Sequence, residues 1–91
     1  MDLLQVIAEP TRRRILGLVW QQELSASEIA DRFDSTFGAV SQHLSVLRDA
    51  QLVSFRREGN RRFYRANHEV LEAMWRETLR GLARTIEDDR W

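Results

Sequence analysis

The residues best suited to chemistry in this chain of 91 residues are arginines, and they are concentrated in one short stretch. Residues 56–65 hold five arginines against one acid, Glu58, which gives this stretch a net charge of +4 in a chain whose formal net charge is zero. The guanidinium group is permanently charged, and its planar donors match phosphate oxygens and the guanine edge. Clustering of positive charge matters more than the total, so the stretch indicates contact with nucleic acid.

Residues suited to enzymatic or metal chemistry are sparse. The chain has no cysteine, which excludes disulfides, thiol nucleophiles and thiolate metal sites, and its two histidines are His43 and His68. It has no glycine-rich phosphate loop and no nucleophile–base spacing. The acid cluster at residues 87–89 falls at a helix C-terminus, where negative charge is unfavourable. We therefore expect no enzyme activity, no catalytic residue, no metal and no cofactor.

A β-hairpin is predicted to position the arginines. Residues 52–57 and 62–66 are rich in strand-forming residues and flank Gly59-Asn60, a hairpin-turn signal. The hairpin would place Arg56, Arg57, Arg61 and Arg62 around a tight turn, where they could contact a DNA backbone. An alternative is an edge hairpin that is charged to prevent aggregation.

Four helices are predicted before the hairpin and one after it. They cover residues 2–8, Pro10 to about Gln22, a short segment opened by the capping box Ser25-Ala26-Ser27-Glu28, about 36–50, and some 20 residues from Asn67. Two short helices joined by a polar turn form the helix-turn-helix pattern. The predicted fold is mainly α: a winged helix-turn-helix of five helices and a two-stranded antiparallel wing, forming a single domain over residues 1–91.

The fourth predicted helix has an outward face suited to a DNA major groove. On a helical wheel Val40, His43, Leu44 and Leu47 share the core side, while the opposite side is small and polar rather than charged. Small residues allow close approach, glutamine can bind an adenine edge, and hydroxyls at a helix start suit phosphate. With the hairpin arginines, the predicted DNA-binding residues are Ser35, Thr36, Gly38, Ala39, Ser41, Gln42, Ser45, Arg56, Arg57, Arg61 and Arg62. The alternative is an ordinary solvent-facing helix.

The last predicted helix carries an apolar stripe formed by Leu71, Trp75, Leu79, Leu82 and Ile86. A stripe of this size is too large to remain uncovered. Part of it is expected to pack within the chain. Because small domains bury a modest fraction of their surface, oligomerisation would also stabilise the protein.

Three segments together resemble the ArsR-type (ArsR/SmtB) winged helix-turn-helix repressors: residues 9–16 (EPTRRRIL), 40–53 (VSQHLSVLRDAQLV) and 57–64 (REGNRRFY). The resemblance extends over about residues 3–85. It implies a homodimer, built from the first and last helices, that binds a palindromic double-stranded operator as a repressor. The dimer interface would then comprise apolar residues of these helices: Leu3, Leu4, Ile7, Leu71, Trp75, Leu79, Leu82 and Ile86.

The chain departs from the pattern of this family in three places. Ser25 and Ser27 replace the cysteine pair of the metal-sensing branch, so the resemblance places the chain in a branch without that site. His68, with Glu69 and Glu72, is a poor match to the branch that binds metal between paired C-terminal helices. Gln51 stands where a glycine usually forms a left-handed cap after the recognition helix; keeping that conformation would cost about 1 kcal/mol.

The sequence therefore predicts a sequence-specific DNA-binding regulator of transcription, with an unknown small-molecule or protein effector. The alternative is a winged-helix protein-interaction module that binds no DNA, which the neutral net charge leaves open. No apolar run reaches the 18 residues of a membrane span, and no secretory signal pattern is found. We expect a cytoplasmic protein that does not contact membranes.

Overall fold

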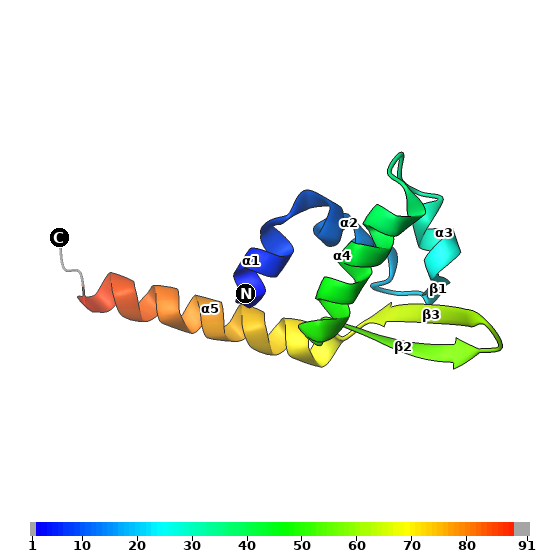
Figure 1. The fold of residues 1–91 in the computed structure, drawn as a ribbon. Helices are drawn as coiled ribbons and strands as arrows, with labels where there is room; N and C mark the ends of the chain where they lie inside the picture. The colour runs from blue at the N-terminus through cyan, green and yellow to red at the C-terminus, as the bar shows by residue number, and fades with distance from the viewer. Residues whose placement is uncertain (1, 89–91) are drawn as a thin grey trace.

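The computed structural model describes residues 2–88 and confirms the mainly helical winged helix-turn-helix fold (Figure 1). Its five helices and three strands follow in the order α1 (Leu3–Ala8), α2 (Pro10–Leu18), β1 (Leu24–Ser25), α3 (Ala26–Ala30), α4 (Phe37–Asp49), β2 (Val53–Glu58), β3 (Arg61–Ala66) and α5 (His68–Asp88). The three strands form one antiparallel sheet with the order β1-β3-β2. In this fold α4 is the recognition helix, and the β2–β3 hairpin is the wing.

Side chains cap the first four helices where the sequence places polar residues. Asp2 caps α1, Glu9 caps α2 ahead of Pro10, and Thr36 caps α4. The predicted capping box at α3 is confirmed: Glu28 N donates to Ser25 Oγ, and Ser25 N donates to Glu28 Oε1, both at 3.1 Å. Each cap satisfies backbone N–H groups that have no partner inside the helix.

The second helix is shorter than predicted, and the sheet has one strand more than the predicted pair. α2 ends at Leu18 rather than about Gln22, because the backbone leaves the helix at Val19 and the Val19 carbonyl accepts Ala66 N–H at 2.9 Å. The freed segment continues into β1, which pairs with β3 in the register Leu24↔Tyr64 and Ser25↔Phe63. Pairing with a distant strand has overridden the helical periodicity.

The hydrophobic core lies between the first four helices and the inner face of the sheet. Its buried side chains come from every element except α5: Val6, Ile15, Leu16, Val19, Leu24, Ile29, Val40, Leu44, Leu47, Leu52, Val53, Tyr64 and Ala66. The core face predicted for α4 is confirmed at Val40, Leu44 and Leu47. This packing fixes α4 so that its opposite face is directed away from the core.

The backbone is strained at Gln51, in the turn that leads from α4 into the wing. Gln51 has a φ of 63° and is the one non-glycine residue with positive φ in the described chain, residues 2–88. Its N–H bonds to the Arg48 carbonyl, and the N–H of Leu52 bonds to the Leu47 carbonyl, both at 2.9 Å. These two bonds form a Schellman motif, and the buried side chains of Leu47 and Leu52 supply its apolar contact. The left-handed cap therefore remains, although a glutamine occupies it.

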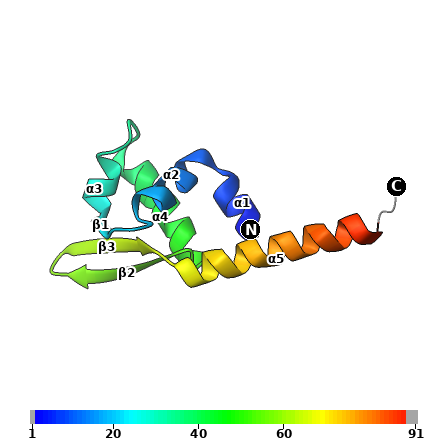
Figure 2. The same cartoon turned by 180° about the vertical axis from the view of Figure 1, so that it is seen from behind.

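The last helix extends away from the rest of the domain past α1 (Figures 1 and 2). The molecule measures 56 × 24 × 21 Å, and the 21 residues of α5 account for roughly 30 Å of helix. Val70 and Leu71 pack against the core near its start, but α5 contributes no fully buried residue. None of the helices in residues 2–88 combines the length and apolar character required to cross a bilayer.

Replacing Gln51 with glycine should stabilise the protein by about 1 kcal/mol, because glycine adopts a positive φ without the steric cost of a Cβ atom. Gln51 is exposed, so the substitution removes no buried contact. Denaturant unfolding at fixed protein concentration would measure the change. Gln51→Ala is the matched control, since it shortens the side chain but keeps the Cβ; an equal gain in both variants would contradict the strain.

Candidate DNA-binding surface

The outward face of α4 is small, polar and accessible. Gly38 and Gln42 are exposed, while Ala39, Ser41 and Ser45 are half-buried. No hydrogen bond from the side chains of Ser41, Gln42 or Ser45 occurs within residues 2–88, so their polar groups are available to a ligand. At its start, Thr36 Oγ1 accepts Ala39 N–H at 3.1 Å. The Thr36 hydroxyl retains its own hydrogen for donation to an acceptor such as phosphate.

The wing brings two arginines side by side without a carboxylate. Arg57 and Arg62 are directly opposed across β2 and β3, and directly opposed side chains share one face of a sheet. Arg62 also lies 5.1 Å from the centre of the Phe55 ring. Neither arginine forms an ion pair in the described residues, although like charges placed opposite one another are destabilising. Gly59, with a φ of 60°, allows the tight turn that holds the pair near the tip.

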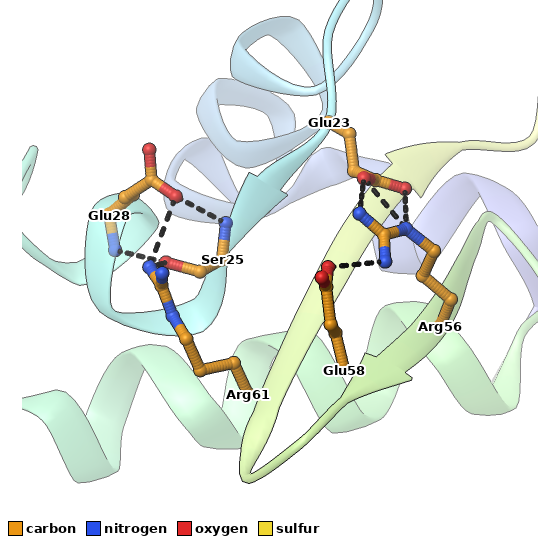
Figure 3. A network of polar contacts seen from close by, with 6 residues as sticks. All are labelled: Glu23, Ser25, Glu28, Arg56, Glu58 and Arg61. Atoms are coloured by element: carbon orange, nitrogen blue, oxygen red, sulfur yellow. Dashed lines mark hydrogen bonds and ion pairs between the residues drawn. The ribbon is translucent and has the colours of Figure 1, made fainter.

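The other predicted wing arginines are held by acidic and polar groups (Figure 3). Arg56 lies between two carboxylates: its Nε and Nη2 are 2.8–3.0 Å from the Glu23 carboxylate, and its Nη1 is 2.8 Å from Glu58. Its hydrogen bond to Glu23 is the largest cause of a raised pKa for Arg56 and of a lowered pKa for Glu23. This clamp joins the wing to the segment just before β1.

Arg61 connects the wing tip to α3 (Figure 3). Its Nη2 donates to Ser25 Oγ at 3.2 Å and lies 3.6 Å from Glu28 Oε1. Arg56 and Arg61 both lie over the Phe63 ring, at 4.7 and 5.0 Å. Local sequence patterns do not predict these partners, since Glu23 and Ser25 are more than 30 residues away from the two arginines along the chain.

The recognition helix and the wing converge on a shared hollow of about 280 Å³. Ser41 contributes from α4, and the wing tip contributes Asn60, Arg61 and Arg62. Residues 25–27, at the start of α3, contribute to the lining as well. The ring of Phe37, the first residue of α4, also lines this hollow and is 55% exposed. Phe37 was not among the residues predicted from the sequence, although it lies within residues 35–45, the segment that supplied the predicted helix contacts to DNA. Of the predicted DNA-binding residues, this hollow brings together Ser41, Arg61 and Arg62.

The residues predicted for a dimer interface fall into two groups. Leu3, Ile7 and Leu71 are half-buried and pack against the core. The remaining side chains are exposed large hydrophobics: Leu4, Trp75, Leu79, Leu82 and Ile86. Four of these lie on α5 beyond the body of the domain, with Trp75 60% and Leu82 55% exposed. Only the first turn of the stripe packs within the chain.

Both histidines have structural contacts. His43 Nδ1 lies 3.8 Å from Glu9 Oε2 and 3.5 Å from Arg12 Nη1, which links α4 to the start of α2. The ring of His68 stacks on Trp20 with centroids 4.0 Å apart, and its Nε2 lies at the Trp20 carbonyl. Within the described part of the chain, no three His, Asp or Glu side chains are grouped so that they could hold a metal ion.

A helix-turn-helix followed by an arginine-bearing wing is the architecture of winged helix-turn-helix regulators of transcription. Residues 9–54 match the model of the bacterial regulatory protein family arsR. The chain therefore belongs to the ArsR family, as its sequence resemblance implies. It is a DNA-binding regulator of transcription and not an enzyme.

Similar proteins span most of the chain. The transcriptional repressor SdpR of Bacillus subtilis is 34% identical over 71 residues, covering 78% of this chain and 79% of its own. The arsenical resistance operon repressor of Staphylococcus xylosus is 36% identical over 70 residues, covering 77% and 67%. A crystal structure of a possible transcriptional regulator for arsenical resistance matches with a TM-score of 0.81 at 36% identity, covering 100% of this chain and 99% of that one.

Replacing Glu23 with glutamine should reduce the loss of stability in acid. Because the folded-state pKa of Glu23 is lowered, its stabilising effect is present above the unfolded pKa and is lost as pH falls through the folded value. The free energy of unfolding, measured between about pH 6 and pH 3, should therefore fall less in Glu23→Gln than in wild type. Arg56→Gln should reduce the same pH-dependent part. If the free energy of unfolding falls equally with pH in wild type and in Glu23→Gln, the ion pair of Glu23 with Arg56 contributes nothing to stability in solution.

Proposed function

We propose that this ArsR-family regulator is a homodimeric repressor that binds a palindromic operator through α4 and the wing. The observation that carries the proposal is the pair of opposed arginines, Arg57 and Arg62, which have no carboxylate partner within residues 2–88, with Arg62 lining the same hollow as Ser41 of α4. Two adjacent guanidiniums without a carboxylate need an anionic partner, and DNA phosphate supplies one. A face lined by glycine, serine and glutamine can enter a major groove closely.

The proposed contacts divide into base reading and phosphate binding. Gln42 reads a base edge with help from Ser41 and Ser45, and the helix start, Ser35 to Ala39, lies against the groove wall. Arg57 and Arg62 bind phosphates from the wing. Arg56 and Arg61 could reach phosphate only by giving up their present carboxylate and hydroxyl partners, so in this scheme they chiefly hold the wing against β1 and α3.

The exposed stripe of α5, together with Leu4 on α1, is the proposed dimer interface. Four large hydrophobic side chains on one uncovered helix would expose a continuous apolar surface in a monomer. A two-fold dimer presents the same surface on both subunits, so this stripe can cover itself. Two protomers would then place their recognition helices in successive major grooves, about 10 base pairs apart.

The regulator is proposed to act in the cytoplasm, on DNA that overlaps a promoter, where bound protein would block polymerase. Its proposed effector is a small molecule or a protein. The serines at positions 25 and 27 offer no thiolate to a metal.

The deciding experiment is a fluorescence-anisotropy titration of the protein against DNA from upstream of its own gene. It would use two salt concentrations, random DNA as the control, and light scattering to obtain the mass. A dimer that binds upstream DNA at least about a hundredfold more tightly than random DNA would support the proposal, since specific sites exceed non-specific ones by roughly 10³ or more. A dimer blind to sequence would instead favour a module that binds proteins.

Two substitutions should separate the proposed roles. Arg57→Ala should weaken operator and random DNA alike and make the salt dependence shallower by about 0.9 per protomer, because one phosphate contact is lost. Gln42→Ala should leave that slope unchanged and reduce the preference for operator about tenfold or more per half-site. Arg84→Ala, on the far side of α5 from the stripe, is the control for lost charge. The reverse pattern would exchange the roles of helix and wing.

Leu82→Glu should convert the dimer to monomers and weaken operator binding by at least tenfold, because it buries a charge in the proposed interface. Sedimentation equilibrium would give the mass, and far-ultraviolet circular dichroism would show that the helices persist. Arg84→Glu introduces the same side chain two residues away on the opposite face, and should remain dimeric. A Leu82→Glu protein that is still dimeric would place the interface elsewhere.

A further inference from the structure

Phe37 is an exposed aromatic residue that neither the core nor the proposed dimer accounts for. The structure exposes seven large hydrophobic side chains in residues 2–88: Leu4, Phe37, Phe55, Trp75, Leu79, Leu82 and Ile86. Leu4 and the four on α5 belong to the proposed interface. Phe55 is partly covered, since Arg48, Arg62 and Tyr64 lie within 6 Å of its ring. That leaves Phe37, which is 55% exposed at the first position of the recognition helix.

The position of Phe37 links it to the DNA-binding surface. Ser41 follows it one helical turn later, and both residues line the hollow shared with Asn60 and Arg62 of the wing. The phenyl ring has no hydrogen-bonding group, so it cannot read the polar edges of adenine, guanine or cytosine. The apolar group that a major groove presents is the C5-methyl of thymine, and phenylalanine is one of the side chains that contacts it.

We propose that Phe37 is a specificity-determining residue that packs on a thymine methyl group in each operator half-site. This inference rests on the proposed function, and adds to it one base that Gln42 and the serines do not read. Phe37 would favour thymine over cytosine at that position, since the two pyrimidines differ there by the methyl and the exocyclic group. Burial of one methyl predicts roughly a fourfold preference per half-site.

The test begins with selection of an operator from random DNA by the wild-type protein. Each thymine of the selected half-site is then replaced by deoxyuracil, which removes only the methyl group, and affinities are measured by anisotropy. We expect one position where uracil weakens wild-type binding about fourfold per half-site. In Phe37→Ala the same replacement should have no effect. Replacing that base pair with one carrying 5-methylcytosine should restore more wild-type affinity than one carrying cytosine.

Two controls make the result specific to Phe37. Gln42→Ala removes a different contact and should retain the uracil effect. Thermal unfolding of Phe37→Ala should match wild type, because the side chain lies outside the core. The inference would be overturned if uracil still weakened binding by Phe37→Ala, or if no thymine-to-uracil replacement weakened binding by the wild-type protein. Either result would leave the repressor proposal intact. A wild-type protein that selects no sequence would overturn both.

Discussion

The left-handed turn at Gln51 is the constraint on which the arrangement of the DNA-binding parts depends. It directs the chain from the end of α4 to Leu52, whose N–H bonds back to Leu47 and whose carbonyl accepts the N–H of Asn67 at 2.9 Å. Leu52 thereby joins the end of the recognition helix, the start of the wing and the approach to α5. The strained turn at Gln51 therefore fixes where the wing begins relative to the end of α4.

Strand alternation divides the four arginines nearest the wing tip into two pairs with different surroundings. Arg57 and Arg62 share a face with Phe55 and Tyr64, whereas Arg56 and Arg61 share the opposite face with Phe63. The second face meets Glu23, Glu28 and Glu58, which offset its positive charge. Exposed ion pairs of this kind contribute little to stability, so their main effect is to orient the hairpin. The net charge of zero thus conceals a polarised wing, with uncompensated charge on the face that carries Arg57 and Arg62.

Sequence reasoning succeeded where structure is set locally and failed where it depends on distant partners. Capping residues, the Gly59 turn and the core face of α4 follow from spacings of two to four residues. The early end of α2 and the existence of β1 depend on hydrogen bonds to β3, some 40 residues later, which no local pattern encodes. The same pairing brings Glu23 to Arg56 and Ser25 to Arg61. Phe37 was overlooked because its wheel position is close to the core side, but at the first turn of α4 the core no longer covers it.

The neutral net charge makes the proposed dimer a requirement for tight binding rather than an accessory. Non-specific affinity for DNA derives almost entirely from phosphate neutralisation, and the wing face shared with Tyr64 offers only two arginines for it in each protomer, Arg57 and Arg62. Joining two protomers through α5 would make contact with the second half-site intramolecular, which raises overall affinity without any new contact. Random DNA offers the pair only weak electrostatic attraction, so most of the binding free energy would come from the base contacts of α4. An inducer that favours a dimer whose two α4 helices no longer match the half-site spacing would therefore release the operator without touching the proposed DNA-binding residues.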